Sequence, residues 1–208
     1  MTRRLYLMRH GYTLFNFLDK KQGWCDSPLT EVGVAQAREA GEHFAELGIS
    51  FDHAYSSPSE RAWRSLELAL GEDYPFVLDK RLREWCFGVL EGHDNYVSPR
   101  PASGDFFVHF GGESEEQVLS RFMPAIDDIM TRPEHENVLI VSHGATTRLF
   151  YREWQAHSRI ESGGQVKNCG VYTYEFDEKT GIYSCVDCWS PSLQTESKIM
   201  DDFPSFPA

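Results

Sequence analysis

The sequence lacks any excess of positive charge. It carries 32 Asp and Glu residues against 20 Lys and Arg residues, which gives a formal net charge of −12 at pH 7. Proteins that bind nucleic acid or an anionic membrane usually present a broad basic face. The composition therefore argues against both partners, and an anionic ligand would have to be bound by a small local cluster of Arg and His side chains.

The sequence also lacks long apolar runs and the regularly spaced cysteines of a disulfide framework. No stretch approaches the roughly 20 apolar residues of a membrane span, and the apolar run after the basic residues 3 and 4 is too short for a signal peptide. The 5 cysteines are scattered, a pattern typical of reduced thiols in the cytoplasm. Cys185 and Cys188 form a lone C-x-x-C with strand-like neighbours, so we expect packing thiols rather than zinc ligands.

Apolar residues divide the chain into alternating strands and helices. Residues 5–8 and 138–141 are unbroken apolar runs, typical of strands that are covered on both faces. Further strands are expected at 51–56, 76–78, 171–176 and 183–189, and helices at 30–47, 57–70, from 114 onwards and at 144–154. This order predicts an α/β fold, a three-layer αβα sandwich whose mostly parallel sheet has helices on both faces.

One domain is expected, because 208 residues of which 41% are hydrophobic suit a single sizeable core. We place this domain at residues 1–189, and residues 190–208 form a tail without a usable pattern. The chain is irregular from Glu84 to Gly112 and rich in glycine, proline and aromatic residues. Residues 85–112 are therefore expected to form a long functional loop that covers the substrate.

Both unbroken apolar strands end in His-Gly, at His10 and at His143. Because ligands bind beyond the carboxyl ends of the strands in such sheets, the two histidines are expected to meet at one edge. Arg9 lies next to His10, and Arg61 lies one turn into the helix that Ser57 is expected to cap, so its side chain should lean toward the same edge. Two arginines, together with the free N–H groups of the helix after Gly144, could bind a phosphate.

Five sequence blocks occur in a specific order between residues 5 and 176. They are Arg9-His10-Gly11-Tyr12-Thr13 with Asn16; Gly23-Trp24, Asp26, Pro28-Leu29-Thr30 and Gly33; Ser56-Ser57-Pro58 with Arg61-Ala62; Glu84 with Phe87-Gly88 and Glu91-Gly92; and Ser142-His143-Gly144. In this order they resemble the histidine phosphatase superfamily, in its phosphoglycerate-mutase-like branch.

The resemblance implies a role for each matching residue. His10 would be the nucleophile that becomes phosphohistidine, and Glu84 would give a proton to the leaving alcohol. The phosphoryl group would be held by Arg9, Arg61 and His143, in a pocket also lined by Thr13, Asn16, Gly23 and Gly144. Since arginines supply the positive charge that phosphoryl transfer needs, neither a metal nor another cofactor is expected.

The resemblance leaves a phosphatase and a mutase open. Mutases of this family carry several basic residues in a segment after the acid glutamate, whereas the only Arg or Lys between Glu84 and Gln117 of this chain is Arg100. Aromatic residues are frequent there, namely Trp85, Phe87, Tyr96, Phe106, Phe107 and Phe110. We therefore favour a phosphatase for a small phosphomonoester with an uncharged or partly apolar body. Lys20 and Lys21 keep an acidic substrate possible.

Two other classes of function are considered. The domain could be a catalytically silent phosphate-binding module, since fold does not determine function, but the presence of every catalytic residue type argues against it. A metal-dependent phosphohydrolase is disfavoured, because His93-Asp94 is an isolated pair without a companion motif. The sequence leaves the oligomeric state open.

Overall fold

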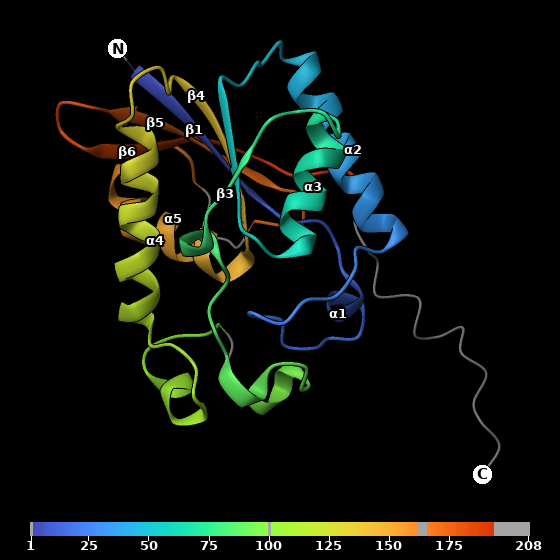
Figure 1. Cartoon of the computed structure of the whole chain (residues 1–208). Helices are drawn as coiled ribbons and strands as arrows, with labels where there is room; N and C mark the ends of the chain where they lie inside the picture. Colours follow the sequence, from blue (N-terminus) through green and yellow to red (C-terminus); the bar gives the residue numbers. More distant parts are fainter. Residues whose placement is uncertain (1, 100, 162–165, 194–208) are drawn as a thin grey trace.

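A six-stranded sheet forms the centre of the molecule in the computed structural model, which describes residues 2–99, 101–161 and 166–193 (Figure 1). The strands are β1 (Thr2–Arg9), β2 (His53–Ser56), β3 (Val77–Leu78), β4 (Asn137–Ser142), β5 (Val171–Asp177) and β6 (Ile182–Trp189). Their order is β3-β2-β4-β1-β5-β6, with parallel pairs from β3 to β1 and antiparallel pairs from β1 to β6. The predicted α/β fold with a mostly parallel sheet is confirmed.

Helices cover both faces of this sheet. They are α1 (Leu14–Phe17), α2 (Glu31–Glu46), α3 (Glu60–Leu70), α4 (Glu115–Met130) and α5 (Gly144–Trp154). Figure 1 shows α2 and α3 together on one side of the sheet and α4 and α5 on the other. Because successive side chains of a strand point to opposite faces, Leu5 and Leu7 of β1 pack toward α4, whereas Tyr6 and Met8 pack toward α2. This double burial explains the unbroken apolar run.

The helix starts follow capping chemistry at two of the three predicted sites. Thr30 caps α2 by accepting a hydrogen bond from the Gly33 N–H, and Ser114 forms a capping box with Gln117 at α4. The third prediction is wrong. The helix α3 begins at Glu60 with Ser59 as its N-cap, two residues later than expected from Ser57. The physical reason is that the Glu60 N–H, which a cap at Ser57 would have to bind, donates to the Asp26 carboxylate instead.

The segment between β3 and α4 crosses the carboxyl edge of the sheet as a chain of short 3₁₀ turns. The turns are Lys80–Leu82, Gly88–Leu90, Asn95–Val97 and Phe106–Phe110, and a fifth, Gln155–His157, follows α5. In Figure 1 this segment, drawn in green, lies beside the α1 loop at the lower end of the sheet. Hydrogen bonds join the two, from Asn95 N to the Asp19 carbonyl (3.0 Å) and from Lys21 N to the His93 carbonyl (2.8 Å).

Two of the cysteines pack in the core, and the last described residues of the chain lie against α2. Cys185 is buried between the sheet and α4, and Cys188 packs at the margin of the same cluster, in agreement with the prediction of packing thiols. None of the helices in the described part of the chain is long and apolar enough to cross a membrane. Of the expected tail, residues 194–208 lie outside the described residues, and Ser192 and Leu193 contact α2 through Glu39.

Candidate active site

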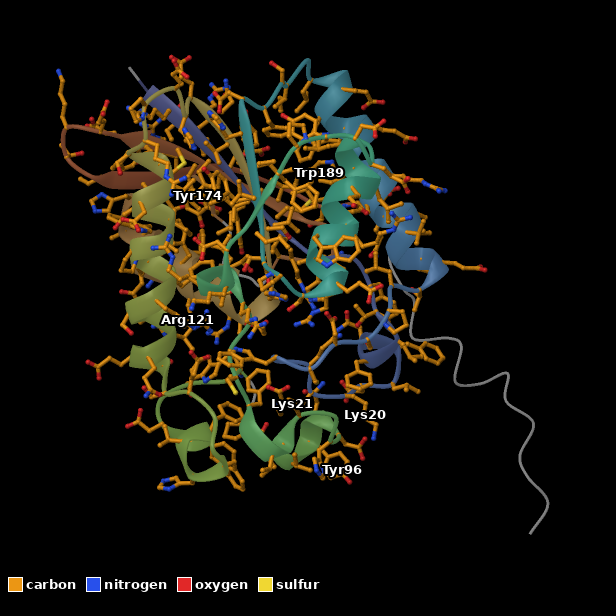
Figure 2. All side chains as sticks on the ribbon, viewed as in Figure 1. Lys20, Lys21, Tyr96, Arg121, Tyr174 and Trp189 are labelled. Carbon is orange, nitrogen blue, oxygen red and sulfur yellow. The ribbon has the colours of Figure 1, made fainter. Side chains whose placement is uncertain are left out.

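A cavity of about 720 Å³ opens at the carboxyl ends of β1 and β4. Its walls come from four parts of the chain that are distant in sequence: residues 9–22, residues 84–102, the first turns of α5, and Asn168. Figure 2 shows Lys20, Lys21 and Tyr96 where the α1 loop meets the turn that contains Asn95. The predicted site residues Arg9, His10, Asn16, Glu84 and Gly144 line this cavity, whereas Thr13, Gly23, Arg61 and His143 lie behind its wall.

His10 is held in one defined state at the floor of the cavity. Its Nδ1 lies 2.8 Å from the carbonyl oxygen of Gly11. Since a carbonyl can only accept, Nδ1 carries the proton and Nε2 keeps its lone pair in the neutral ring. Burial, Arg61 and Arg9 lower the pKa of His10 well below its usual value. The ring is therefore neutral at pH 7, with Nε2 available as a nucleophile.

His143 lies beside His10, with 5.2 Å between the ring centroids. Its Nε2 is hydrogen-bonded to the Ser57 Oγ at 2.7 Å, and its buried Nδ1 has no hydrogen-bond partner among the described residues. Burial, followed by the charge of Arg61, lowers the pKa of His143 well below its usual value. The structure thus brings together two neutral imidazoles that are 133 residues apart along the chain but lie at one edge of the sheet.

The two predicted phosphate-binding arginines have different settings. Arg9 lines the cavity and donates from Nη1 to the Val166 carbonyl at 3.2 Å. Arg61 is completely buried, and it donates to the Gly23 carbonyl (2.7 Å), the Cys25 carbonyl (3.0 Å) and the Asp26 carboxylate (2.8 Å). The loop after α1 therefore fixes the Arg61 guanidinium behind the two histidines, where its charge lowers both imidazole pKa values.

Gly23 supports Arg61 and does not line the cavity. A Cβ atom at this position would lie 2.4 Å from the Trp85 carbonyl oxygen and 2.6 Å from the Glu91 carboxylate, so only glycine allows the two loops to approach this closely. Thr13 is also a supporting residue, since its hydroxyl is bonded to Gln22 (2.8 Å) and caps α1. Asn16 alone of these three lines the cavity.

Glu84 lies at the N-terminus of α5. Its Oε2 accepts from the Ala145 N–H (2.9 Å), and its Oε1 accepts from the N–H groups of Thr146 (3.2 Å) and Trp85 (2.9 Å). The side chain is only 6% exposed, and it lines the cavity. The environment of Glu84 is therefore a buried helix terminus. Neither Arg61 nor Arg83 is its hydrogen-bond partner among the contacts of the described residues.

Several residues of the site carry no sequence signal that would have found them. Arg121, from α4, donates to the carbonyls of Arg81 (2.9 Å), Arg83 (2.7 Å) and Glu84 (2.8 Å), and so holds the backbone on which Glu84 stands. Asn168 donates to the His10 carbonyl at 3.1 Å and lines the cavity. Arg148 also lines the cavity. Arg121 and Asn168 lie far from the motif blocks, and Arg148 follows the Ser142-His143-Gly144 block by four residues without belonging to it. Only the fold shows that these three residues belong to the site.

The aromatic residues of segment 85–112 do not form the expected substrate surface. Trp85 and Phe107 are fully buried and pack with Phe87 and Phe106 in a small core of their own, with ring centroids 4.7 to 5.8 Å apart. The described residues of the segment that line the cavity are Phe87, Asn95, Pro99, Pro101 and Ala102. Arg100 lies outside the described residues. The composition predicted that aromatic rings would line the substrate cavity, but most of the rings pack against one another and stabilise segment 85–112 itself.

Among the residues that the structure describes, no group of three or more His, Cys, Asp or Glu side chains is arranged to hold a metal ion.

Comparison with known proteins identifies the family. A family model described as histidine phosphatase superfamily (branch 1) matches residues 5–187. A 2,3-bisphosphoglycerate-dependent phosphoglycerate mutase of Methylobacterium sp. (strain 4-46) is 36% identical over 164 residues, which are 71% of this chain and 78% of the mutase. The solved structure of Bacillus stearothermophilus YhfR is 31% identical with a TM-score of 0.74, over 88% of this chain and 94% of that one.

A second solved structure is the mycobacterial glucosyl-3-phosphoglycerate phosphatase Rv2419c, which is 25% identical with a TM-score of 0.72 and covers 91% of this chain and 100% of its own. Proteins named as mutases and as phosphatases are thus both similar to this chain. The match of the family model over most of the sequence agrees with the five blocks read from the residues. The chain belongs to the histidine phosphatase superfamily, branch 1.

Proposed function

We propose that the chain is a phosphatase that hydrolyses a small phosphomonoester through a phosphohistidine at His10, in a catalytic domain that spans residues 1–189. The observation that carries the proposal is the state of His10, a neutral ring with its Nε2 lone pair free because Nδ1 donates to the Gly11 carbonyl. A neutral imidazole can attack phosphorus when nearby arginines supply the positive charge. Arg9 in the cavity and Arg61 behind it supply that charge.

The first half-reaction forms the bond between His10 Nε2 and phosphorus as the bond from phosphorus to the alcohol oxygen breaks. Arg9 and the N–H group of Gly144, at the start of α5, stabilise the phosphoryl oxygens. The Ser57 hydroxyl, donating to His143 Nε2, would leave the proton on Nδ1, the buried atom without a partner, which can then donate to a phosphoryl oxygen. Glu84 gives the leaving alcohol its proton.

The second half-reaction transfers the phosphoryl group to water. Glu84, now a carboxylate, takes a proton from the water as its oxygen attacks phosphorus, and the bond to Nε2 breaks. Hydrolysis is favoured over transfer to a second hydroxyl because the described part of segment 85–112 contributes no cation to the cavity wall. A mutase must retain a doubly phosphorylated intermediate, for which basic residues in this segment would be expected.

The alternative is a phosphoglycerate-mutase reaction, in which the same phosphohistidine passes its group to a hydroxyl of a phosphorylated sugar acid. The 36% identity to a protein named as such a mutase favours it. A catalytically silent phosphate-binding module is the other alternative, and a nitrophenyl phosphate assay separates it from both enzymes.

The test is a panel of phosphorylated metabolites in which phosphate release and isomer formation are both measured, with and without a chelator. We expect phosphate release without isomers, unchanged by the chelator. A quenched reaction should yield an acid-labile, base-stable phosphoenzyme that is absent from His10→Ala. Isomer formation in excess of phosphate release would assign a mutase, and label on a residue other than His10 would overturn the mechanism.

A further inference from the structure

The turn before β5, residues 167–170, is bonded to the backbone of the first sequence block of the site. The Arg9 N–H donates to the Gly170 carbonyl at 3.0 Å, and the Cys169 N–H donates to the His10 carbonyl at 3.2 Å. Cys169 has a φ of +53°, a left-handed conformation that is uncommon for a residue other than glycine. Such a conformation persists where the surrounding structure imposes it. The shape of this turn is therefore tied to the end of β1.

One side chain of the turn, Asn168, connects the proposed nucleophile to a second residue of the site. It is half-buried and lines the cavity. Its Nδ2 donates to the His10 carbonyl and to the Asn16 Oδ1, at 3.1 Å in both cases. Because a backbone carbonyl can only accept, the Asn168 atom that faces His10 is the nitrogen. Both N–H groups of this amide are thus bonded within the protein.

The orientation of the Asn16 amide follows from its own partners. Its Oδ1 accepts from the Thr13 backbone N–H at 3.2 Å as well as from Asn168. A backbone N–H can only donate, so the Asn16 atom that faces Thr13 is the oxygen, and the nitrogen points away. Asn16 lines the cavity, and its Nδ2 donates to no residue in the described part of the chain. Its two N–H groups are therefore available to a ligand in the cavity.

The bond from Asn168 restricts a torsion that is otherwise loose. The last side-chain torsion of asparagine has a broad energy well, so the single bond to Thr13 would restrain the Asn16 amide less than two bonds do. A donor that is oriented before the reaction stabilises a phosphoryl group without the cost of ordering it at that moment. Fixing the Asn16 amide should therefore contribute to the rate.

We propose that Asn168 is a positioning residue that holds the Asn16 amide with its N–H groups directed at the phosphoryl group. This inference rests on the proposed function, in which Asn16 belongs to the phosphate-binding pocket. Asn168 acts through Asn16, since its own N–H groups are bonded to His10 and Asn16. Because every substrate carries the same phosphoryl group, the contribution of Asn168 does not depend on the leaving alcohol.

The test is a double-mutant cycle of Asn168→Ala and Asn16→Ala. Each single variant should lower kcat/KM about 10-fold, as expected for one lost hydrogen bond to a charged group. The double variant should be about as slow as Asn16→Ala, because no amide is then left to orient. Losses that multiply to about 100-fold in the double variant would overturn the inference, since they would mean that Asn168 acts independently of Asn16.

The choice of substrate gives a second readout. Asn168→Ala should slow an alkyl phosphate and nitrophenyl phosphate by the same factor, because the proposed contact is to the group that both share. A loss confined to the alkyl phosphate would place Asn168 at the leaving group and reject the positioning role.

A near-isosteric variant and a matched control separate orientation from charge and stability. Asn168→Asp turns the donor into an acceptor that faces the Asn16 Oδ1, so its loss should exceed that of Asn168→Ala; an equal loss would contradict the proposed orientation. The loss due to the added charge alone persists in the Asn16→Ala background and is subtracted. Asn137→Ala removes an amide at the opposite end of β4 and should have no effect. Melting temperatures identify a variant that fails to fold.

Binding of inorganic phosphate distinguishes this inference from the proposed function. Calorimetric titration of the wild-type protein, both single variants and the double variant reports recognition without turnover. Weaker binding in each single variant, with no further loss in the double variant, would support the positioning role even if no ester is hydrolysed. Phosphatase activity combined with additive losses of phosphate binding would retain the proposed function and reject the role of Asn168.

Discussion

Replacing Glu84 by Gln perturbs two properties that the structure allows to be separated. The carboxylate accepts three backbone N–H bonds, from Trp85, Ala145 and Thr146. A carboxamide keeps one accepting oxygen and places an NH₂ group where the other oxygen was. At least one backbone N–H then faces a donor instead of an acceptor, although Gln is nearly isosteric with Glu.

The magnitude follows from burial. An unsatisfied buried N–H costs about 1–3 kcal/mol, and losing a negative charge at a helix N-terminus costs about 0.3–1 kcal/mol. We therefore expect Glu84→Gln to lower the free energy of unfolding by about 1–4 kcal/mol. In a protein of this size 1 kcal/mol corresponds to roughly 2–4 °C, so the melting temperature should fall by roughly 2–16 °C.

The catalytic effect depends on the leaving group. An alkyl alcohol needs a proton as it leaves, whereas a nitrophenolate does not, so alkyl esters should slow by about 10²–10⁴ and nitrophenyl phosphate much less. Both rates are measured on one preparation below its melting temperature. Equal losses on the two substrates would remove Glu84 from the mechanism. An unchanged melting temperature would refute the argument about its backbone bonds.

Ser57→Ala removes the 2.7 Å bond to His143 and should lower kcat about tenfold with little change in KM. The control Ser120→Ala, on the surface of α4, should have no effect. A change in KM alone would contradict a role of Ser57 in positioning His143. Gly23→Ala should lower both stability and specific activity, because the added Cβ would clash with the Trp85 carbonyl and shift the Gly23 carbonyl that binds Arg61. The control Gly48→Ala adds a Cβ that meets no atom. Because Gly48 has a left-handed backbone (φ +64°), this control should lower stability alone. The pKa values of His10 and His143 are lowered on folding. Below about pH 6.5 both rings therefore become protonated in the unfolded chain but stay neutral in the native protein. As the pH is lowered below about 6.5, the free energy of unfolding should therefore decrease by about 1.4 kcal/mol per pH unit for each ring. His10→Gln should show a shallower dependence of stability on pH. An identical dependence would show that His10 does not contribute.

Much of the fold could be predicted because its signals are local. The unbroken apolar runs of β1 and β4 predicted central strands, and Thr30 and Ser114 identified helix starts with their own hydroxyl groups. Ser57 had the same signal, and it failed because the Glu60 N–H that it would cap donates to a tertiary partner, the Asp26 carboxylate. A capping motif records what a side chain can do, and the fold decides which partner it finds.

The site was predictable only in part. The motif blocks marked His10 and Glu84, but composition could not tell whether Phe106 and Phe107 face the cavity or one another. Lys21 was noted only as a cation near the site, since its position over two rings depends on contacts between distant segments. Roles that depend on side-chain direction, burial and long-range pairing leave no periodic trace in a single sequence.

The bonds of Arg121 have a consequence for folding. Glu84 stands on a backbone that has no strand or α-helix of its own, and three carbonyls around it are bound by one guanidinium from α4. The carboxylate in turn binds the first turn of α5. We therefore expect Glu84 to reach its position during refolding only after α4 has docked, so recovery of activity on alkyl phosphates should lag behind recovery of helical signal. Assembly of the sheet alone would produce a phosphate pocket without a proton donor.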